Sequence, residues 1–358
     1  MSAETGGTAN GQDSPLITQM RTEIGEQPAA LRATLDALLP RTTEVAAVAE
    51  GTRQVLFIGR GTSDNAAVYG SYLIQVYAGR LATLGSPSVA TTYHSQADLS
   101  GVLVVALSQS GRTEEIVATL DWAARCGART LAVTNSATSP LAESAELALV
   151  TEAGPEHAVP ATKTFVTQLA ALAVLGIGLG AEVNADDLRR VPDEVERMLG
   201  EPGDIETAAA DLAGAAGMVV SGRGLAYAPA LELALKLKEA CYVHAMGLSY
   251  ADLLHGPIAV VDARTPAIIV AADDGPALDG AIKLARRVTG ANAKALAIGG
   301  GPGLARECTR ALPGPRLPEW LAPLGLIVPG QLLTEATARR LNLNPDAPRG
   351  LSKVTQTA

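Results

Sequence analysis

Short apolar runs alternate with helix-like patterns through the first half of the chain. The runs are rich in aliphatic and β-branched residues and lie at 54–58, 101–107, 129–134 and 147–150. Between them, and over 16–49, apolar residues recur at helical spacing. Strands that alternate with helices are typical of a parallel sheet whose connections cross over as helices. We therefore expect an α/β domain at 16–185, with helices ahead of its first strand.

The same alternation begins again in the second half of the chain. Further apolar runs lie at 218–221, 266–271, 294–299 and 324–328. The triplet Gly-Arg-Gly directly follows the first predicted strand of each half, at 59–61 and at 222–224. This repeated order predicts two tandem doubly wound parallel-sheet domains of the flavodoxin-like kind, the second at 216–340.

Three segments fall outside the two predicted domains. The polar and acidic stretch 186–215 is expected to form a connecting helix. Residues 1–15 are rich in Gly, Ser and Thr and lack the basic start and apolar core of a signal peptide, so we expect a disordered tail. Residues 341–358 contain Pro345 and Pro348 without clear periodicity, which favours an extended tail.

Composition and charge exclude several functions. The 358 residues carry a formal net charge of −9, which argues against broad nucleic-acid binding. No uncharged apolar run is long enough to predict a membrane span. The three cysteines and four histidines show neither disulfide nor metal-ligand spacing. We therefore expect a cytoplasmic protein that binds neither nucleic acid nor membrane and needs no metal or organic cofactor.

Polar side chains cluster where two predicted helices begin. They are Thr62 and Ser63 after the first strand, and Ser108, Gln109, Ser110 and Thr113 after the second. A helix N-terminus offers free N–H groups and a positive dipole end, and hydroxyls add donors, so this pattern predicts a phosphate site. Helix capping alone explains one or two such residues, but not two sets. Because neither a P-loop nor a dinucleotide fingerprint is present, a sugar phosphate fits better than a nucleotide.

Several longer segments resemble a known family. The segments "ALSQSGRTEEIVATL" and "GRGTSDNAAVYGSYL" resemble a sugar isomerase (SIS) domain. The later segments "GRGLAYAPALELALKLKEACYVHAMGLSYADLLHGPIAVVD", "AGPEHAVPATKTFVTQLA" and "PRGLSKVTQT" resemble the isomerase region of glucosamine-6-phosphate synthase. The resemblance runs from about residue 50 to the C-terminus. It implies two SIS domains, a small-molecule sugar phosphate as ligand, and a homodimer with active sites at its interface.

The candidate catalytic residues gather on one predicted helix and at two further positions. Glu232, Lys236 and Glu239 share a helix face, a pattern that by itself favours a solvated ion-pair stripe. The resemblance implies instead that Glu239 moves a proton between C1 and C2 of an open-chain sugar and that Lys236 supports the developing charge. It further implies that His255 opens the sugar ring and that Lys353 can form an imine with a ketose. The remaining sugar contacts that it implies are Gly61, Val159, Ala161 and Ser352.

The chain also departs from the synthase pattern. We expect no glutaminase domain ahead of the first SIS domain. Ala161 lacks a substrate-facing hydroxyl, and Arg112 stands where the synthase loop is acidic. We therefore expect an enzyme that acts on a hexosamine 6-phosphate, first of all a glucosamine-6-phosphate deaminase/isomerase that releases fructose 6-phosphate and ammonia. One alternative is an N-acetylglucosamine-6-phosphate dehydratase, a lyase that eliminates at C3. Another is a sugar-phosphate sensor without turnover.

Overall fold

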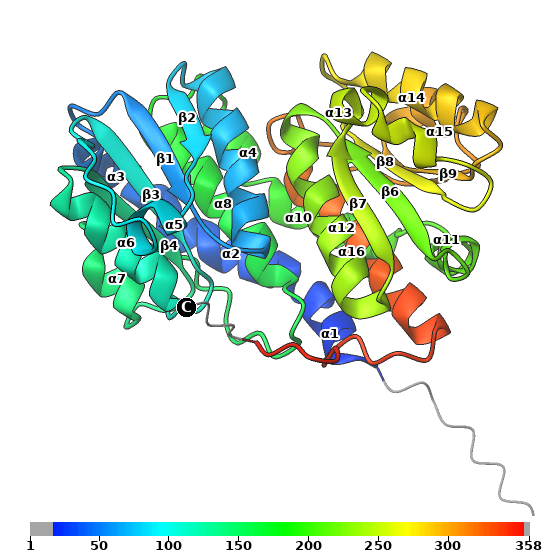
Figure 1. Ribbon diagram of the computed structural model, residues 1–358, viewed down its shortest axis with the longest axis horizontal. Coiled ribbons are helices and arrows are strands. Elements are labelled where there is room, and N and C mark those ends of the chain that lie inside the picture. Colours follow the sequence, from blue (N-terminus) through cyan, green and yellow to red (C-terminus); the bar gives the residue numbers. More distant parts are fainter. Residues whose placement is uncertain (1–16, 354–358) are drawn as a thin grey trace, which may run out of the picture.

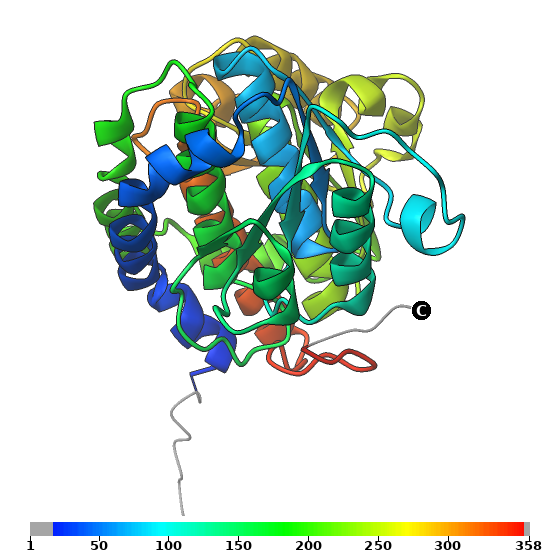
Figure 2. The ribbon, with the colours of Figure 1, turned by 90° about the vertical axis from the view of Figure 1, so that its left-hand side faces the viewer.

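Two α/β halves lie side by side in the computed structural model, which describes residues 17–353 (Figure 1). The predicted disordered tail at 1–15 and the last five residues, 354–358, lie outside the described part of the chain. The helices predicted over 16–49 are α1 (Gln19–Gly25), α2 (Gln27–Leu38) and α3 (Thr42–Val48), with the 3₁₀ turn η1 (Leu39–Arg41) between the last two. Figure 2 shows these leading helices (blue) beside α8 (Lys163–Gly178, green) on one side of the first half.

The first sheet has five parallel strands. They are β1 (Gln54–Ile58), β2 (Leu81–Leu84), β3 (Val102–Leu107), β4 (Arg129–Thr134) and β5 (Leu147–Val150). Their order is β2-β1-β3-β4-β5, so the chain reverses its direction of winding between β1 and β3. The connecting helices are α4 (Thr62–Tyr77), α5 (Ser88–Thr91), α6 (Glu114–Arg125) and α7 (Pro140–Ser144).

The second sheet repeats this topology. Its strands are β6 (Gly217–Gly222), β7 (His244–Ser249), β8 (Ala267–Ala271), β9 (Ala295–Gly299) and β10 (Arg310–Leu312). The order β10-β9-β8-β6-β7 is the order of the first sheet read from its other edge. The two Gly-Arg-Gly triplets follow β1 and β6, the equivalent first strands. The prediction of two tandem doubly wound parallel-sheet domains is thus confirmed.

Helices cover the second sheet and fill the space between the halves. They are α9 (Ala185–Leu188), α10 (Val191–Gly200), α11 (Ile205–Leu212), η2 (Gly224–Ala226), α12 (Tyr227–Cys241), α13 (Tyr250–Leu254), η3 (Pro257–Val260), α14 (Leu278–Gly290), α15 (Gly301–Ala305) and α16 (Ala322–Arg340). The connector 186–215 was predicted as one helix but contains α10, α11 and part of α9. Pro202-Gly203 separates α10 from α11, since neither residue continues a helix well.

One strand prediction is wrong. Residues 324–328 lie inside α16. This helix is buried on almost every side, so its sequence is apolar in a continuous run, and a short apolar run cannot separate a buried strand from a buried helix. The sequence also gave no prediction for β2, β7 and β10. Two of these are edge strands of three or four residues, and β7 interrupts its apolar pattern with the exposed His244 and with Gly247.

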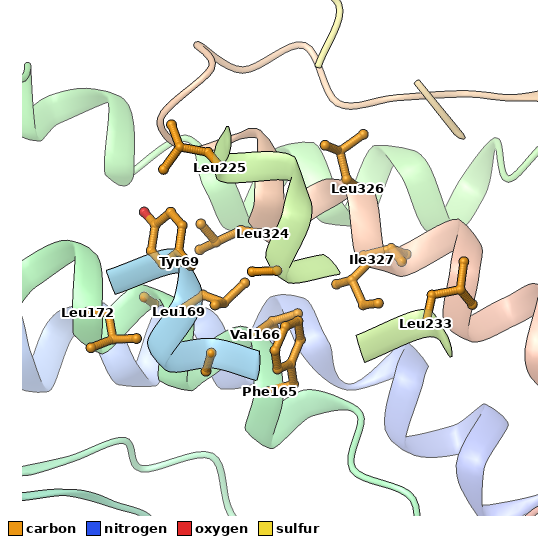
Figure 3. Close-up of a cluster of buried hydrophobic side chains, with 14 of the residues drawn as sticks. Tyr69, Phe165, Val166, Leu169, Leu172, Leu225, Leu233, Leu324, Leu326 and Ile327 are labelled. Carbon is orange, nitrogen blue, oxygen red and sulfur yellow. The ribbon is translucent and has the colours of Figure 1, made fainter. Parts of the chain in front are cut away.

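The main core joins the two halves into one body. Figure 3 shows Tyr69 of α4 and Phe165 of α8 packed near Leu233 of α12 and Ile327 of α16, all of them buried. The Tyr69 hydroxyl donates a hydrogen bond to the Trp320 carbonyl at 2.9 Å across this core. Helices α4 and α12 therefore face each other at a fixed distance, one from each half. This contact positions the candidate site.

Candidate functional site

A cavity of about 330 Å³ opens beyond the carboxyl ends of β1 and β3. This is where the winding of the first sheet reverses, the usual ligand position in open α/β sheets. Every site residue predicted from the sequence lines it except His255: Gly61, Thr62, Ser63, Ser108, Gln109, Ser110, Thr113, Val159, Ala161, Lys236, Glu239, Ser352 and Lys353. The first half, α12 of the second half and the C-terminal tail thus share one cavity.

Two helix N-termini face the cavity and suit it to an anion. Helix α4 begins after Gly61, which has a φ of 55°, and α6 begins after Thr113. Between β3 and α6 the backbone turns at Gly111, with a φ of 62°. A Cβ at Gly111 would overlap the Ser139 side chain and lie 2.9 Å from Thr134 Oγ1, so only glycine fits this turn. The turn brings backbone N–H groups and hydroxyls to one place.

The hydroxyls of this cluster are held in different ways. Ser63 Oγ accepts a hydrogen bond from Gln168 Nε2 at 3.0 Å, and Ser110 Oγ accepts one from the Arg112 backbone N–H at 3.2 Å. Each of these two serines keeps its own proton for a ligand oxygen. Thr62 instead donates its proton to Glu232 Oε1 at 2.9 Å. Its hydroxyl therefore links this cluster to α12 rather than donating to the ligand. We call the cluster of polar side chains at the two helix N-termini the anion cradle; its members are Thr62, Ser63, Ser108, Gln109, Ser110 and Thr113.

Lys236 lies between two carboxylates on α12. Its Nζ is 3.3 Å from Glu232 Oε1 and 2.6 Å from Glu239 Oε2, and its side chain is only 1% exposed. Burial alone would lower the pKa of Lys236, but the charges of Glu232 and Glu239 outweigh burial and raise it. A protonated ammonium is thus fixed beside the cavity, where it can stabilise negative charge on a ligand oxygen.

The two carboxylates differ in their surroundings. Glu232 is fully buried and accepts hydrogen bonds from Thr62 and from Asn65 Nδ2, the latter at 2.8 Å. Burial raises the pKa of Glu232, and the charge of Lys236 opposes this only in part. Glu239 lines the cavity and is 23% exposed, so it can reach a ligand. The Glu239 carboxylate is therefore accessible to a ligand in the cavity, whereas the Glu232 carboxylate is enclosed between α4 and α12.

Lys353 meets a buried carboxylate that the sequence did not single out. Its Nζ lies 2.6 Å from Glu156 Oε2 and 2.7 Å from the Ala158 carbonyl oxygen. Glu156 also accepts hydrogen bonds from the backbone N–H groups of Thr162 and Thr164. Burial would raise the pKa of Glu156, but the charge of Lys353 and these donors outweigh it and lower the pKa. An ionised Glu156 therefore holds the Lys353 side chain at the cavity wall through an ion pair.

His255 lies away from this cavity. It follows α13 in the second half and its side chain is exposed. The structure does not bring it to Glu239 within this chain. The cavity wall also contains residues that were not predicted: Arg60, Leu107, Ile116, Glu156 and Leu351. Arg60 pairs with Glu115 at 2.8 Å, and Glu156 stands in the quoted segment "AGPEHAVPATK", but nothing local in the sequence distinguishes either residue.

The corresponding point of the second sheet, between β6 and β8, is nearly filled. Its cavity measures about 10 Å³, room for roughly one water molecule. Asp274 and Glu319 lie on its wall together with Arg223 and Tyr250. Burial, and then the charge of Asp274, raise the pKa of Glu319. The carboxylates of Asp274 and Glu319 repel a phosphate, and the cavity is too small to hold one, so only the first of these two equivalent positions is open to an anion.

Two features that residues 17–353 lack bear on possible ligands. No group of three or more His, Cys, Asp or Glu side chains is arranged to hold a metal ion within this part of the chain. None of its helices is both long and apolar enough to cross a membrane.

The fold and the cavity define a protein with two doubly wound domains and an anion cradle at the switch point of the first. The SIS domain family matches residues 50–178 and 211–315, one segment in each half. The chain belongs to this family.

Curated relatives of the chain are glutamine–fructose-6-phosphate aminotransferases. The protein from Symbiobacterium thermophilum is 37% identical over 358 residues, and that from Methanothermobacter thermautotrophicus 34% over 345 residues. Each match covers 93% of this chain but only 58% and 56% of the two relatives. The chain thus spans a little over half the length of the curated relatives it matches.

Solved structures share the whole architecture. A Silicibacter pomeroyi protein provisionally assigned as a phosphosugar isomerase is 33% identical, with a TM-score of 0.82 over 92% of this chain and 100% of that chain. The C-terminal domain of glucosamine-fructose-6-phosphate aminotransferase from Francisella tularensis is 26% identical, with a TM-score of 0.84 over 92% and 98%. Glucosamine-6-phosphate deaminase from Thermotoga maritima, at 22% identity and a TM-score of 0.74 over 95% and 100%, shares the fold.

The anion cradle leads to a first prediction. We expect the double substitution Ser110→Ala with Thr113→Ala to raise the half-saturation concentration for a sugar phosphate at least about tenfold, because hydrogen bonds to a charged group are lost. Turnover at saturation should change by less than about threefold, since neither hydroxyl belongs to the Lys236–Glu239 pair. Steady-state kinetics check this. Thr138→Ala with Ser144→Ala, outside the cavity in the same domain, is the matched control. Collapsed turnover with unchanged half-saturation would contradict the anchoring role.

Proposed function

We propose that this chain is a glucosamine-6-phosphate deaminase/isomerase, which converts glucosamine 6-phosphate and water into fructose 6-phosphate and ammonia. The observation that carries the proposal is that a hydroxyl-lined anion cradle and the Lys236–Glu239 pair open into one cavity. The cradle holds the phosphate at C6, so that the other end of the open-chain sugar extends toward α12. A cavity of about 330 Å³ suits a ligand of this size.

The proposed chemistry begins at the carbon next to the aldehyde. Glu239 removes the proton from C2 of the open-chain aldehyde, and the electron pair of the C–H bond moves into a C1–C2 double bond, leaving an enolate oxygen at C1. The Lys236 ammonium stabilises this oxygen. Glu239 then returns the proton to C1 while the nitrogen lone pair forms a C2=N bond. A proton passes from this iminium nitrogen to the C1 oxygen, which leaves a hydroxyl at C1 and an imine at C2. Water adds to that imine, and ammonia leaves as fructose 6-phosphate forms.

Lys353 has two possible roles in this reaction: it can stabilise negative charge as a second cation, or form an imine with the C2 carbonyl as an amine. In its ion pair with Glu156, Lys353 can assist water addition by stabilising the negative charge that develops on the oxygen added at C2. An imine between Lys353 and the C2 carbonyl requires that its Nζ first lose a proton, and Glu156 at 2.6 Å is the nearest acceptor. The lowered pKa of Glu156 makes it a weak base, so this ion pair favours the role of Lys353 as a cation.

The relatives support the same class of substrate. Aminotransferases at 34–37% identity act, by name, on fructose 6-phosphate, although this chain spans only 56–58% of them. The Silicibacter pomeroyi chain, which is matched over its full length, is provisionally assigned to phosphosugar isomerisation. These names support a hexose phosphate ligand and aldose–ketose chemistry for the two SIS domains together.

A second candidate reaction follows from Ala161. This residue lines the cavity with a methyl group where the synthase pattern has a hydroxyl, beside the apolar wall of Val159. The smaller, less polar wall favours an acetamido group at C2. With N-acetylglucosamine 6-phosphate, the same proton removal at C2 followed by loss of the C3 hydroxyl as water would make the chain a dehydratase.

One assay separates these reactions. The chain is incubated with glucosamine 6-phosphate and, separately, with its N-acetyl form, while ammonia, ketose and absorbance of an unsaturated carbonyl are followed. Ammonia and ketose from the free amine support the deaminase. Ultraviolet absorbance from the acetylated sugar alone rejects the deaminase in favour of the dehydratase. Tight binding of either sugar without product or solvent-proton exchange would reject both in favour of a sensor.

The proposed function includes a homodimer that completes the site. His255 is exposed and lies outside the cavity, next to the exposed apolar side chains of Leu254 and Val260. On the first half, the segment around α5 projects from the body (Figure 2) and exposes Val89 and Tyr93. Exposed apolar side chains beside a functional residue fit a surface covered by a second copy. That copy's His255 would then open the sugar ring in this cavity.

Mixing two inactive variants tests the composite site. We expect His255→Ala and Glu239→Gln each to be inactive alone. A refolded equal mixture should recover about 25% of wild-type turnover, because half of the dimers are mixed and each of these holds one complete site. Steady-state assays and sedimentation of the mixture check this. A wild-type chain that is active as a monomer, or a mixture no more active than its parents, would contradict the shared site.

A further inference from the structure

The C-terminal tail runs across both halves along the edge of the candidate cavity. After α16 the residues 341–353 form neither helix nor strand, and residues 349–352 are exposed. Figure 1 shows this segment (red) passing from the second half, past α1, to the first half. An exposed segment without secondary structure is fixed only by its few contacts. Those contacts therefore decide where Ser352 and Lys353 lie in the cavity.

The first contact of the tail is made by Asp346, which is too far from Lys353 along the chain to fix the position of that lysine. Asp346 accepts hydrogen bonds from the backbone N–H groups of Gln19 and Met20, at 2.9 and 2.7 Å, and caps α1. Its carbonyl oxygen accepts the Val159 N–H at 2.9 Å. Seven residues of extended chain can span about 23–25 Å, so this anchor alone leaves Lys353 a wide range of positions.

A second contact, much nearer to Lys353, is made by Tyr242. The Tyr242 hydroxyl accepts a hydrogen bond from the Arg349 backbone N–H at 2.8 Å. The Arg349 guanidinium lies 4.3 Å from the centre of the Tyr242 ring, within cation–π distance. Tyr242 directly follows α12, three residues after Glu239, whereas Arg349 comes four residues before Lys353. One side chain thus connects the helix of the candidate base to the tail of the candidate lysine.

The backbone of Tyr242 shows that helix termination does not explain this residue. Its φ of 56° and ψ of 28° are left-handed, a conformation in which helices usually end with glycine or asparagine. A tyrosine is strained there, so glycine would end α12 at least as well. Backbone strain of this kind persists where another contact needs the side chain. Here the ring and hydroxyl of Tyr242 contact Arg349.

We propose that Tyr242 is a positioning residue that holds the tail so that Lys353 stands opposite Glu239 across the cavity. The proposal rests on the function proposed above, because the spacing of these two groups matters only if both act on one ligand. On the far side, Lys353 is held by Glu156 and the Ala158 carbonyl of the first half. Residues 349–353 are therefore fixed at both ends, by Tyr242 of the second half at Arg349 and by Glu156 of the first half at Lys353.

The substitution Tyr242→Gly distinguishes a role of Tyr242 in positioning the tail from a role in stabilising the fold. We expect the melting temperature to stay equal or rise, because glycine relieves the left-handed strain. Amide hydrogen exchange over residues 343–353 should accelerate about tenfold, since a hydrogen bond and a cation–π contact are lost. The KM for glucosamine 6-phosphate should rise about tenfold and kcat should fall, whereas Tyr242→Phe, which keeps the ring, should show smaller changes. Asn292→Gly, at another left-handed position with a φ of 57°, is the matched control and should alter neither tail exchange nor kinetics.

The outcomes distinguish this proposal from the proposed function. Unchanged tail exchange in Tyr242→Gly, or faster exchange with unchanged KM and kcat, would overturn the positioning role. A fall in melting temperature that accounts for the lost activity would also overturn it. Faster exchange in a protein whose wild type neither binds nor converts glucosamine 6-phosphate would confirm that Tyr242 anchors the tail and reject the deaminase/isomerase function.

Discussion

Replacing Glu239 by glutamine is expected to leave glucosamine 6-phosphate bound while proton exchange at C2 falls by on the order of 10²–10⁴-fold. The side chain lines the cavity beside the Lys236 ammonium, and no phosphate donor depends on it. Glutamine keeps the shape and a hydrogen-bond acceptor for Lys236 but cannot take a proton from carbon. Exchange of the C2 hydrogen in heavy water, followed by NMR, measures the step without requiring product release.

The matched control for Glu239→Gln is Glu201→Gln, whose carboxylate is 70% exposed on the second half and does not line the cavity. Its exchange rate should equal that of the wild type. Binding of glucosamine 6-phosphate by calorimetry should agree within about threefold between the two variants and the wild type. Exchange that continues undiminished in Glu239→Gln would remove this residue from the role of base.

Replacing Lys236 by methionine is expected to destabilise the fold by about 3 kcal/mol at pH 7, because the buried Glu232 loses its cation. Without Lys236, burial holds the pKa of Glu232 still further above its ordinary value, so the folded state keeps a proton that the unfolded state releases. The unfolding free energy of the variant should therefore increase as pH falls from 8 to 5. This slope should be steeper than in the wild type, whose Lys236 has a raised pKa and stays charged throughout that range.

Urea unfolding at several pH values measures both effects. Lys238→Met on the same helix is the matched control, because Lys238 is exposed and its substitution should change stability by less than about 0.5 kcal/mol. Activity of Lys236→Met should be lost even under conditions in which the variant is folded. A Lys236→Met protein as stable as Lys238→Met at every pH would show that the buried carboxylate does not depend on this lysine.

Most of the fold could be predicted because strands buried on both faces are apolar throughout. The runs at 54–58, 129–134 and 147–150 coincide with β1, β4 and β5. The same reasoning placed a strand at 324–328, where α16 is buried on almost all sides and is apolar for the same reason. Edge strands such as β2 and β10 are short, and their sequences carry too little of the apolar signal to be found.

The candidate site could be predicted where its residues are close in sequence. Ser108, Ser110 and Thr113 lie within six positions, so their hydroxyls stand out at the start of a helix. Partners that are far apart gave no such signal. Glu156 and Lys353 are 197 positions apart, and Thr62 and Glu232 are 170 apart, so only the packed structure shows that they meet. The exposed position of His255 is likewise a property of tertiary structure.

The contact between α4 and α12 has a consequence for recombination between members of this family. Thr62 and Asn65 come from one copy of the duplicated domain, and the carboxylate that they bind, Glu232, comes from the other. A chimera that exchanges one copy for that of a homologue must carry a compatible hydroxyl, amide and acid across the junction. Otherwise the buried Glu232 keeps Lys236 of its own copy but loses its hydroxyl and amide donors from the other copy. The two halves are therefore coupled through Glu232, and neither can be exchanged without residues that match the other.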